Sequence, residues 1–388
     1  MKIRRILTLA LAMMLVLGLV AGCAQSSATT TTAAAGETTT AAAETTKAAA
    51  PAEKIKVGVI YISPKNDGGW SQAHADGFAA AVAAVGADKI DLKEIENVND
   101  ADAQQTETAL NQLVADGCQI IFATSFGYME TTAKVASENP DIKFEHCSGY
   151  MSADNFANYF AQIEQPRFLS GIVAGRMTKS NTIGYVAAMQ IPEVYRGINA
   201  FTLGVRSVNP DAVVKVTWTN TWFNPQLEKE AAISLIDSGA DVLAQHQDST
   251  AVQQAAQEKG AFGIGYDNPM YSEAIKDAYL TAPVFKWGAY YEQRLAAMLD
   301  GSWTTGAYWG GMNDGVVALD AMTALVPAEV QTEVNALVDT MKAQGNDFVF
   351  AGPLKDNTGA ERVAAGSSLS ADDQFAMDWF VEGVVEAK

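Results

Sequence analysis

The chain has 388 residues, of which 48% are hydrophobic and 18% charged, and this length allows two globular domains of average size. Acidic residues outnumber basic ones by 45 to 26, which gives a net charge of −19. Such an acidic surface repels phosphate groups, so we expect neither a nucleic acid partner nor adhesion of the folded part to anionic lipid.

The first 22 residues have the pattern of a bacterial signal peptide. Basic residues near the start precede an apolar run at 6–20, which is shorter than a membrane-spanning helix requires. Small residues then lead directly to Cys23, as in the lipobox of lipoproteins. We expect a lipoprotein signal peptide at 1–22 and lipidation of Cys23, which would anchor the protein at the outer face of the cytoplasmic membrane. The alternative is an ordinary secretory signal in which Cys23 is incidental.

A linker follows the signal peptide. Residues 24–54 are almost only Ala, Thr, Ser and Glu and have no apolar periodicity. Such a segment cannot offset the entropy lost on ordering, and β-branched Thr between the alanines disfavours a helix. We therefore expect a disordered tether at 23–54, which would hold the folded part roughly 30 Å from the membrane.

From residue 55 onward, strand-like apolar runs alternate with amphipathic helical patterns. The first series predicts three strands and two helices, at 56–62, 71–85, 90–96, 101–116 and 119–124. The pattern then restarts at 182–187, 198–208, 213–219, 225–238 and 241–245. Strands that alternate with helices in this way indicate βαβ units and a parallel sheet.

The two series also share a weak internal repeat. Residues Ala109, Leu113 and Gly117 are matched by Ala231, Leu235 and Gly239, each 122 positions later. The repeat favours two similar lobes over one long sheet. Because ligands bind outside the carboxyl ends of parallel strands, we expect the lobes to face each other across a cleft and to close by hinge motion.

Two cysteines and three histidines lie in the globular part. Cys118 opens the strand at 119–124, whereas Cys147 closes a strand at 143–147. Parallel strands would place these thiols at opposite ends of the sheet, so we expect both to be buried and free. The histidines show no metal-ligand spacing, so no metal site is predicted.

The loop after the first strand supplies the first candidate ligand contacts, Asp67, Trp70, Ser71 and Gln72. Two glycines before Trp70 would let the backbone approach a ligand closely. The indole of Trp70 can present a flat apolar face to the cleft, although a tryptophan at this junction could instead cap the sheet core.

Later strand ends add further candidates. They are Ser125, Phe126, Tyr128, Trp222, Gln247, Asp248 and Asp267, with Phe223 and Tyr266 open between packing and ligand contact. Two aromatic planes around a flat heterocycle would each add about 0.5–1.5 kcal/mol beyond the burial of area. The carboxylates would accept hydrogen bonds from hydroxyl or ring N–H groups.

Lys286 is the notable cation. It lies between Phe285 and Trp287, after a strand-like run that should cross between the lobes. We expect it to be buried and paired with an aspartate, the alternative being an ordinary solvated lysine.

Seven of these segments together resemble the basic membrane protein (BMP) family of solute-binding lipoproteins, whose members bind purine nucleosides or related purines for ABC importers. They are residues 56–59, 67–77, 124–128, 245–249, 265–267, 280–288 and 309–315. The resemblance implies an α/β type I periplasmic-binding-protein fold, with two Rossmann-like lobes joined by a hinge with three crossovers. The implied boundaries are 55–165 plus 284–312 for the N-terminal lobe and 166–283 plus 313–388 for the C-terminal lobe.

The resemblance also implies roles for individual residues. Nucleoside binders of the family sandwich the base between two aromatics, here Trp70 and Trp222, and hold the ribose with an aspartate and a lysine, here Asp267 and Lys286. Many of them have Lys-Ser-Phe-Asn where this chain has the four residues 68–71, Gly-Gly-Trp-Ser. This variant resembles a branch that binds a free nucleobase such as adenine, so the sugar stays open.

A binding protein is favoured over an enzyme. The sequence has no Gly-x-Ser-x-Gly elbow, no phosphate-cradling Gly-x-x-x-x-Gly-Lys and no His-Glu-x-x-His site. We predict a monomeric extracytoplasmic lipoprotein that needs no cofactor, captures a purine nucleoside or nucleobase, and docks on ABC permease subunits. The alternatives are a sugar or other small-solute receptor of the same fold, or a nucleoside-processing enzyme.

Overall fold

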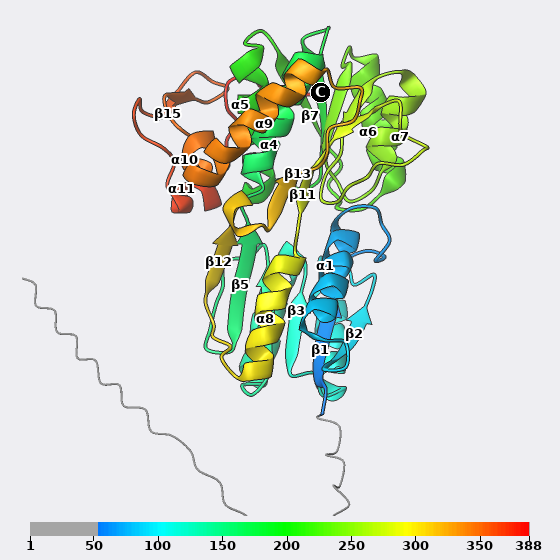
Figure 1. Ribbon diagram of the computed structural model, residues 1–388, viewed down its shortest axis with the longest axis vertical. Coiled ribbons are helices and arrows are strands. Elements are labelled where there is room, and N and C mark those ends of the chain that lie inside the picture. The colour runs from blue at the N-terminus through cyan, green and yellow to red at the C-terminus, as the bar shows by residue number, and fades with distance from the viewer. Residues whose placement is uncertain (1–52, 388) are drawn as a thin grey trace, which may run out of the picture. The chain divides into compact units, whose positions relative to one another are not determined.

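Two six-stranded parallel sheets organise the computed structural model, which describes residues 53–387. Each sheet is the centre of one α/β lobe, and Figure 1 shows the two lobes one above the other with thin connections between them. The signal peptide predicted at 1–22, the lipidation of Cys23 and nearly all of the linker lie outside the described residues. None of the helices within 53–387 has the length and hydrophobicity that a membrane span needs.

The N-terminal lobe contains the sheet with strand order β12-β5-β4-β3-β1-β2. Its strands are β1 (Ile55–Ile60), β2 (Ile90–Ile95), β3 (Ile120–Ala123), β4 (Lys143–Cys147), β5 (Phe156–Ala161) and β12 (Ala307–Gly310). Its helices are α1 (Trp70–Val85), α2 (Ala103–Ala115), α3 (Met129–Glu138) and α8 (Gly288–Asp300), with a short 3₁₀ turn η1 (Phe126–Tyr128). Helices on both faces bury the central strands, and therefore β3 is a continuous apolar run and β5 is apolar except for Asn158.

The C-terminal lobe repeats this plan with strand order β10-β9-β8-β6-β7-β16. Its strands are β6 (Thr182–Ala187), β7 (Val213–Trp218), β8 (Val242–His246), β9 (Phe262–Ile264), β10 (Tyr279–Thr281) and β16 (Val384–Glu386). Its helices are α4 (Glu164–Met177), α5 (Pro192–Val208), α6 (Pro225–Asp237) and α7 (Ala251–Lys259). Helices α4 and α5 are in close contact, because a side-chain carbon on Gly204 would lie only 2.0 Å from the carbonyl oxygen of Phe168.

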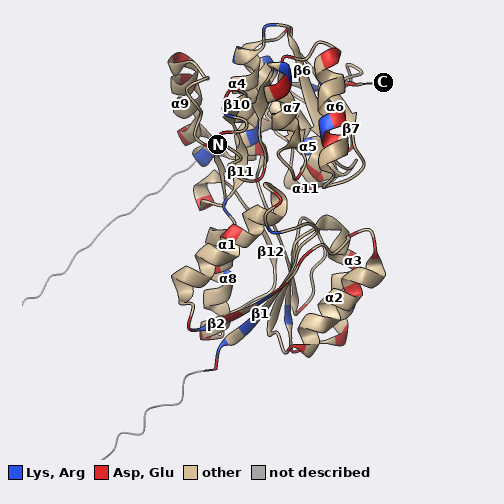
Figure 2. Ribbon diagram, turned by 90° about the vertical axis from the view of Figure 1, so that its right-hand side faces the viewer, with Lys and Arg blue, Asp and Glu red and all other residues tan. Residues whose placement is uncertain are grey.

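The chain crosses between the lobes three times within the described residues, after β5, after β10 and after β12. Two of these crossings form a small antiparallel pair, β11 (Pro283–Phe285) with β13 (Val317–Leu319), next to the turn η2 (Met312–Asp314). Figure 2 shows this narrow waist from the side, with charged residues spread over the helices of both lobes.

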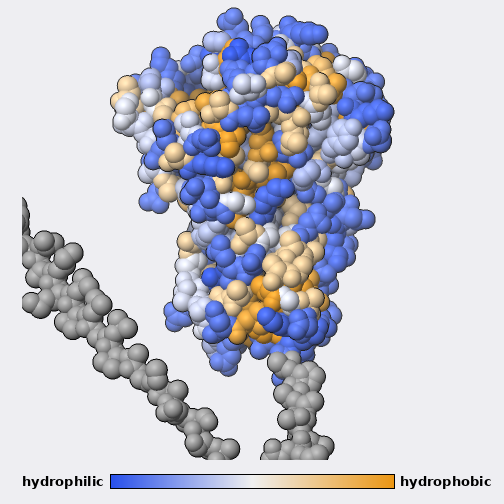
Figure 3. All heavy atoms as spheres, viewed as in Figure 1, coloured by the Kyte–Doolittle hydropathy of each residue, from blue (hydrophilic) through white to orange (hydrophobic). Residues whose placement is uncertain are grey.

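The chain ends with short elements packed on the C-terminal lobe. They are α9 (Ala328–Gln344), α10 (Asn346–Val349), β14 (Leu354–Lys355), β15 (Glu361–Val363) and α11 (Ala371–Phe375), followed by β16. In the view of Figure 3, hydrophilic residues cover most of the surface of the protein. Apolar residues lie beside α9 and at the end of α8 that is farther from the C-terminal lobe.

The predicted fold class, two parallel α/β lobes, is confirmed. Cys118 precedes β3 and Cys147 ends the neighbouring strand β4, so the two thiols lie at opposite ends of these strands, and both are buried and unbonded as predicted. Burial raises the pKa of the Cys118 thiol to about 11, which makes it a poor nucleophile at neutral pH.

Candidate functional site

A cavity of about 310 Å³ lies between the two lobes, at the carboxyl ends of their strands. Each lobe contributes five lining residues: Ile62, Trp70, Ser125, Phe126 and Ser148 from one, and Glu193, Trp222, His246, Asp248 and Tyr266 from the other. This volume includes space that is open to solvent. The position agrees with the rule that ligands of parallel α/β sheets bind at strand carboxyl ends.

Trp70, at the start of α1, is fixed by packing on the N-terminal lobe side of the cavity. Its indole Nε1 donates to the Thr124 carbonyl oxygen at 2.6 Å, and its ring meets His74 edge-on at 4.4 Å between centroids. Only 8% of the residue is exposed. The two interpretations of this tryptophan are therefore compatible, because it packs in the core and also lines the cavity.

Trp222 contributes the second indole, from the loop after β7 on the opposite lobe. It is half-buried, and its Nε1 donates to the Asp100 carboxylate of the N-terminal lobe at 3.2 Å. This hydrogen bond fixes the Trp222 ring across the cleft. Tryptophans from both lobes thus line one cavity, which suits a planar solute.

Gly69 explains how closely the two lobes approach beside the cavity. A side-chain carbon at Gly69 would lie 2.5 Å from the backbone carbonyl oxygen of Asp248 on the other lobe. Any larger residue would hold the lobes apart here. The glycine noted in the sequence therefore permits the approach of one lobe to the other.

Ser148 and Glu193 form a second bond across the cleft. The Ser148 hydroxyl donates to Oε2 of Glu193, whose Oε1 lies 3.3 Å from Nε2 of His246. Burial lowers the pKa of His246 to about 4, so its ring is neutral at neutral pH. Burial alone would raise the pKa of Glu193, but the hydrogen bonds from His246 and Ser148 bring it below its usual value.

Two buried carboxylates near the cavity have no hydrogen-bond donor among residues 53–387, those of Asp248 and Asp267. Asp248 is 3% exposed and lines the cavity, and burial together with the charge of Asp267 raises its pKa well above the usual value. Asp267 is fully buried at a φ of 66°, and burial raises its pKa although the Arg167 cation opposes this. The Arg167 guanidinium lies 3.5 Å from the ring centroid of Tyr266, a lining residue.

The remaining predicted residues of the first loop serve the start of α1. The Asp67 carboxylate accepts from the backbone N–H groups of Gly69 at 2.8 Å and Ser71 at 2.9 Å, and the Ser71 hydroxyl lies 2.6 Å from that of Ser63. Gln72 is half-buried. None of Asp67, Ser71 and Gln72 lines the cavity.

Three further predicted residues also lie outside the cavity lining. Tyr128 is buried and its hydroxyl donates to the Val98 carbonyl, while the Gln247 side chain donates to the Thr219 hydroxyl at 2.6 Å. Lys286 is exposed, on a groove beside α1 and α8. The burial expected for this lysine is absent because its side chain points to solvent while Phe285 and Trp287 fill the core.

Four lining residues were outside the predicted set, namely Ile62, Ser148, Glu193 and His246. Ser148 directly follows the strand predicted at 143–147, so the strand-end rule would have found it. His246 ends β8 and had been weighed only as a metal ligand. The sequence signal was therefore present for these two.

The fold and the cavity together are those of a two-lobed solute-binding protein. Residues 54–345 match the family model of PnrA-like ABC transporter substrate-binding proteins, the Bmp family. The chain belongs to this family. The resemblance found in the sequence is therefore confirmed, and with it the conclusion that this is a substrate-binding protein rather than an enzyme.

Named relatives and solved structures support this assignment. A purine-binding protein of Brucella abortus is 42% identical over 334 residues, covering 86% of this chain and 93% of the relative. A Haloferax volcanii protein whose name proposes glucose binding is 39% identical over 336 residues, covering 86% and 81%. A solute-binding protein structure from Conexibacter woesei has a TM-score of 0.61 at 25% identity, covering 74% of this chain and 96% of that chain. One from Aeropyrum pernix has a TM-score of 0.63 at 19% identity, covering 83% and 96%, and shows the fold alone.

Proposed function

We propose that the protein captures a purine outside the cytoplasm, while anchored through Cys23, and delivers it to an ABC permease. The main support is that Trp70 and Trp222 line one cavity from opposite lobes, with the Asp248 carboxylate beside them. Indole faces suit a flat heterocycle, and a carboxylate without a donor suits its N–H groups. The printed name of the Brucella relative agrees with this ligand class.

A free base fits this cavity better than a nucleoside. The lining excludes Asp267 and Lys286, the two residues to which the family resemblance assigns the ribose, and Lys286 faces solvent. We therefore rank adenine-like bases above nucleosides.

A sugar is the second candidate, because the Haloferax relative carries a glucose-binding name. Sugars also pack on tryptophan, and their hydroxyl groups can donate to the Asp248 carboxylate, so a binding measurement must separate the two ligand classes. Calorimetric titration of residues 24–388, unfolded and refolded to remove bound solute, would compare adenine, adenosine, ribose and glucose. We expect micromolar binding, about −8 kcal/mol, for adenine, weaker binding for adenosine and none for the two sugars.

Two tryptophan variants provide a matched test of the cavity. Trp222→Ala removes a half-buried indole that lines the cavity, whereas Trp218→Ala removes a half-buried indole bonded to Glu386, away from it. We expect Trp222→Ala to weaken adenine binding at least about tenfold, roughly 1.4 kcal/mol, and Trp218→Ala to leave it unchanged. Binding of glucose without adenine, or full affinity in Trp222→Ala, would contradict the proposal.

A further inference from the structure

The last part of the chain lies outside the matched family model and yet packs on the hinge. The family match ends at residue 345, and α10 and α11 follow it. Gly345 approaches the first crossover, since a side-chain carbon there would lie 3.3 Å from Oε1 of Gln162. This terminal segment, residues 346–377, is therefore placed where the two lobes are joined.

Side-chain hydrogen bonds tie two of the crossovers together at this point. The Gln165 side chain accepts from the Met312 backbone N–H at 2.9 Å, and Gln162 donates to the Trp309 carbonyl at 3.3 Å. Gln162 and Gln165 also bond to each other. The first crossover, after β5, is thereby joined to the third, after β12.

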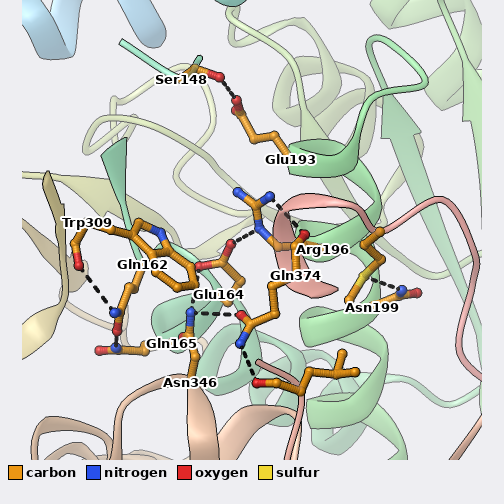
Figure 4. A network of polar contacts seen from close by, with 12 residues as sticks. Ser148, Gln162, Glu164, Gln165, Glu193, Arg196, Asn199, Trp309, Asn346 and Gln374 are labelled. Carbon is orange, nitrogen blue, oxygen red and sulfur yellow. Dashed lines mark hydrogen bonds and ion pairs between the residues drawn. The ribbon is translucent and has the colours of Figure 1, made fainter. Parts of the chain in front are cut away.

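A buried ion pair lies next to these glutamines. Glu164 and Arg196 are 2.5 Å apart and only 0% and 2% exposed. The terminal segment completes the pair, because Asn346 donates to Oε2 of Glu164 at 3.3 Å and the Gln374 carbonyl accepts from Arg196 at 3.1 Å. A buried pair of this kind depends on such additional hydrogen bonds, as removal of a partner leaves an uncompensated charge. Figure 4 shows Arg196 between Glu164 and Gln374.

Phe375 of the terminal segment contacts both lobes. Its ring lies 5.0 Å from the Arg196 guanidinium of α5, in the C-terminal lobe. It also meets Trp309 of β12, in the N-terminal lobe sheet, at 4.7 Å between ring centroids. A single side chain therefore bridges the two bodies that must rotate for the cleft to open.

Helix α5 links Arg196, and with it the terminal segment, to the cavity. Arg196 lies one turn after Glu193 on α5, and Glu193 lines the cavity and bonds to Ser148 of the opposite lobe. The contacts that hold Arg196 in place therefore also hold the helical turn that carries Glu193. Figure 4 shows these residues on one helix, with Ser148 above and the terminal segment below.

We propose that residues 346–377 form a brace that holds the hinge in the closed arrangement and thereby raises ligand affinity. Phe375 and Asn346 are the positioning residues of this brace and do not touch the ligand. Its link to affinity rests on the proposed binding function, whereas its effect on lobe closure does not. Loss of the brace should lower the closed fraction of the free protein and reduce the apparent affinity by the same factor.

Phe375→Ala tests the brace, with Phe380→Ala as its control. Phe380 belongs to the same terminal region but packs on Tyr195 and Trp218, both in the C-terminal lobe. We expect Phe375→Ala to enlarge the radius of gyration of the ligand-free protein in small-angle X-ray scattering and to weaken adenine binding about tenfold. Phe380→Ala should lower the melting temperature and change neither readout.

The outcomes separate the two proposals. Unchanged scattering and affinity in a folded Phe375→Ala protein would overturn the brace. Enlarged scattering in a protein that binds no purine would support the brace and overturn the proposed function. Should Phe375→Ala fail to fold, Asn346→Ala, which removes the side-chain hydrogen bonds to Glu164 and Gln374 and no ring, is measured in the same way with the same two outcomes.

Discussion

Asp248→Asn should make the folded protein more stable while it weakens ligand binding. Asp248 is almost fully buried and its carboxylate receives no hydrogen bond from residues 53–387. After burial, the charges that raise its pKa are those of other acids, Asp267 first and then Asp67 and Glu228. An ionised carboxylate in this position is stabilised far less in the folded state than in water.

The magnitude follows from the burial and the like charges. Removal of one unpaired buried charge of this kind should raise the free energy of unfolding by roughly 1–3 kcal/mol at neutral pH. At about 2 °C per kcal/mol for a protein of this size, the melting temperature should rise by about 2–6 °C. Asn keeps one acceptor oxygen but loses the charge, so we expect adenine to bind about tenfold more weakly, a change of roughly 1.4 kcal/mol.

The pH dependence of stability shows whether the Asp248 charge destabilises the folded protein. Since the pKa of Asp248 is raised in the folded state, the folded protein takes up a proton more readily than the unfolded chain as the pH falls. The wild-type protein therefore regains stability on acidification, and its difference from Asp248→Asn should shrink between pH 8 and pH 5. Thermal melts of both proteins at these two pH values would measure it.

Asp211→Asn is the matched control, because Asp211 is exposed and its side chain makes no hydrogen bond within the described residues. Its melting temperature should equal that of the wild type at both pH values. A melting temperature of Asp248→Asn that fell by equal amounts at pH 8 and pH 5 would refute the reasoning, because the ionised carboxylate would then stabilise the fold.

Ser148→Ala removes a hydrogen bond to Glu193 across the cleft, so adenine affinity measured by calorimetry should fall about fivefold, near 1 kcal/mol, and an unchanged affinity would mean that this bond does not contribute to closure. Acid should destabilise the fold through His146, whose pKa burial lowers to about 4. The unfolded chain takes up this proton near pH 6.5 and the folded protein does not, so stability present above pH 6.5 is lost as the pH falls towards 4. His146→Gln should remove roughly 2.4 kcal/mol of this loss in denaturant titrations at pH 7 and 4.5, and an equal pH dependence of the two proteins would contradict the assignment.

The sequence could predict the fold because its strands and helices have strong periodicity and end at turn residues. The strand predicted at 56–62 is β1 at Ile55–Ile60, and the helix predicted at 225–238 is α6 at Pro225–Asp237. One helix was predicted too short: 198–208 is the end of α5, which begins at Pro192. Its first turn carries Glu193, a polar residue that faces the cavity, and apolar periodicity cannot detect such a turn.

The candidate site was less predictable, because the strand-end rule selects loops and not side-chain directions. Asp67 and Asp248 both follow strands, yet the first caps α1 with its carboxylate while the second lines the cavity without a donor. Which of the two carboxylates lacks a hydrogen bond depends on whether backbone N–H groups lie within hydrogen-bonding distance of it. Lys286 shows the same limit, since its position between two buried aromatics is compatible with a side chain that points outward.

Some buried acids of this protein have a cationic partner and others do not. Glu145 in β4 and Glu164 at the hinge each lie 2.5 Å from an arginine, Arg294 and Arg196. Asp248, at the cavity, has neither an arginine nor a donor among the described residues. An uncompensated buried charge costs several kcal/mol, so a fold selected for stability alone would not keep it. We propose that N–H groups of the bound solute donate to the Asp248 carboxylate, which lines the cavity, whereas Glu145 and Glu164 have arginine partners within the protein.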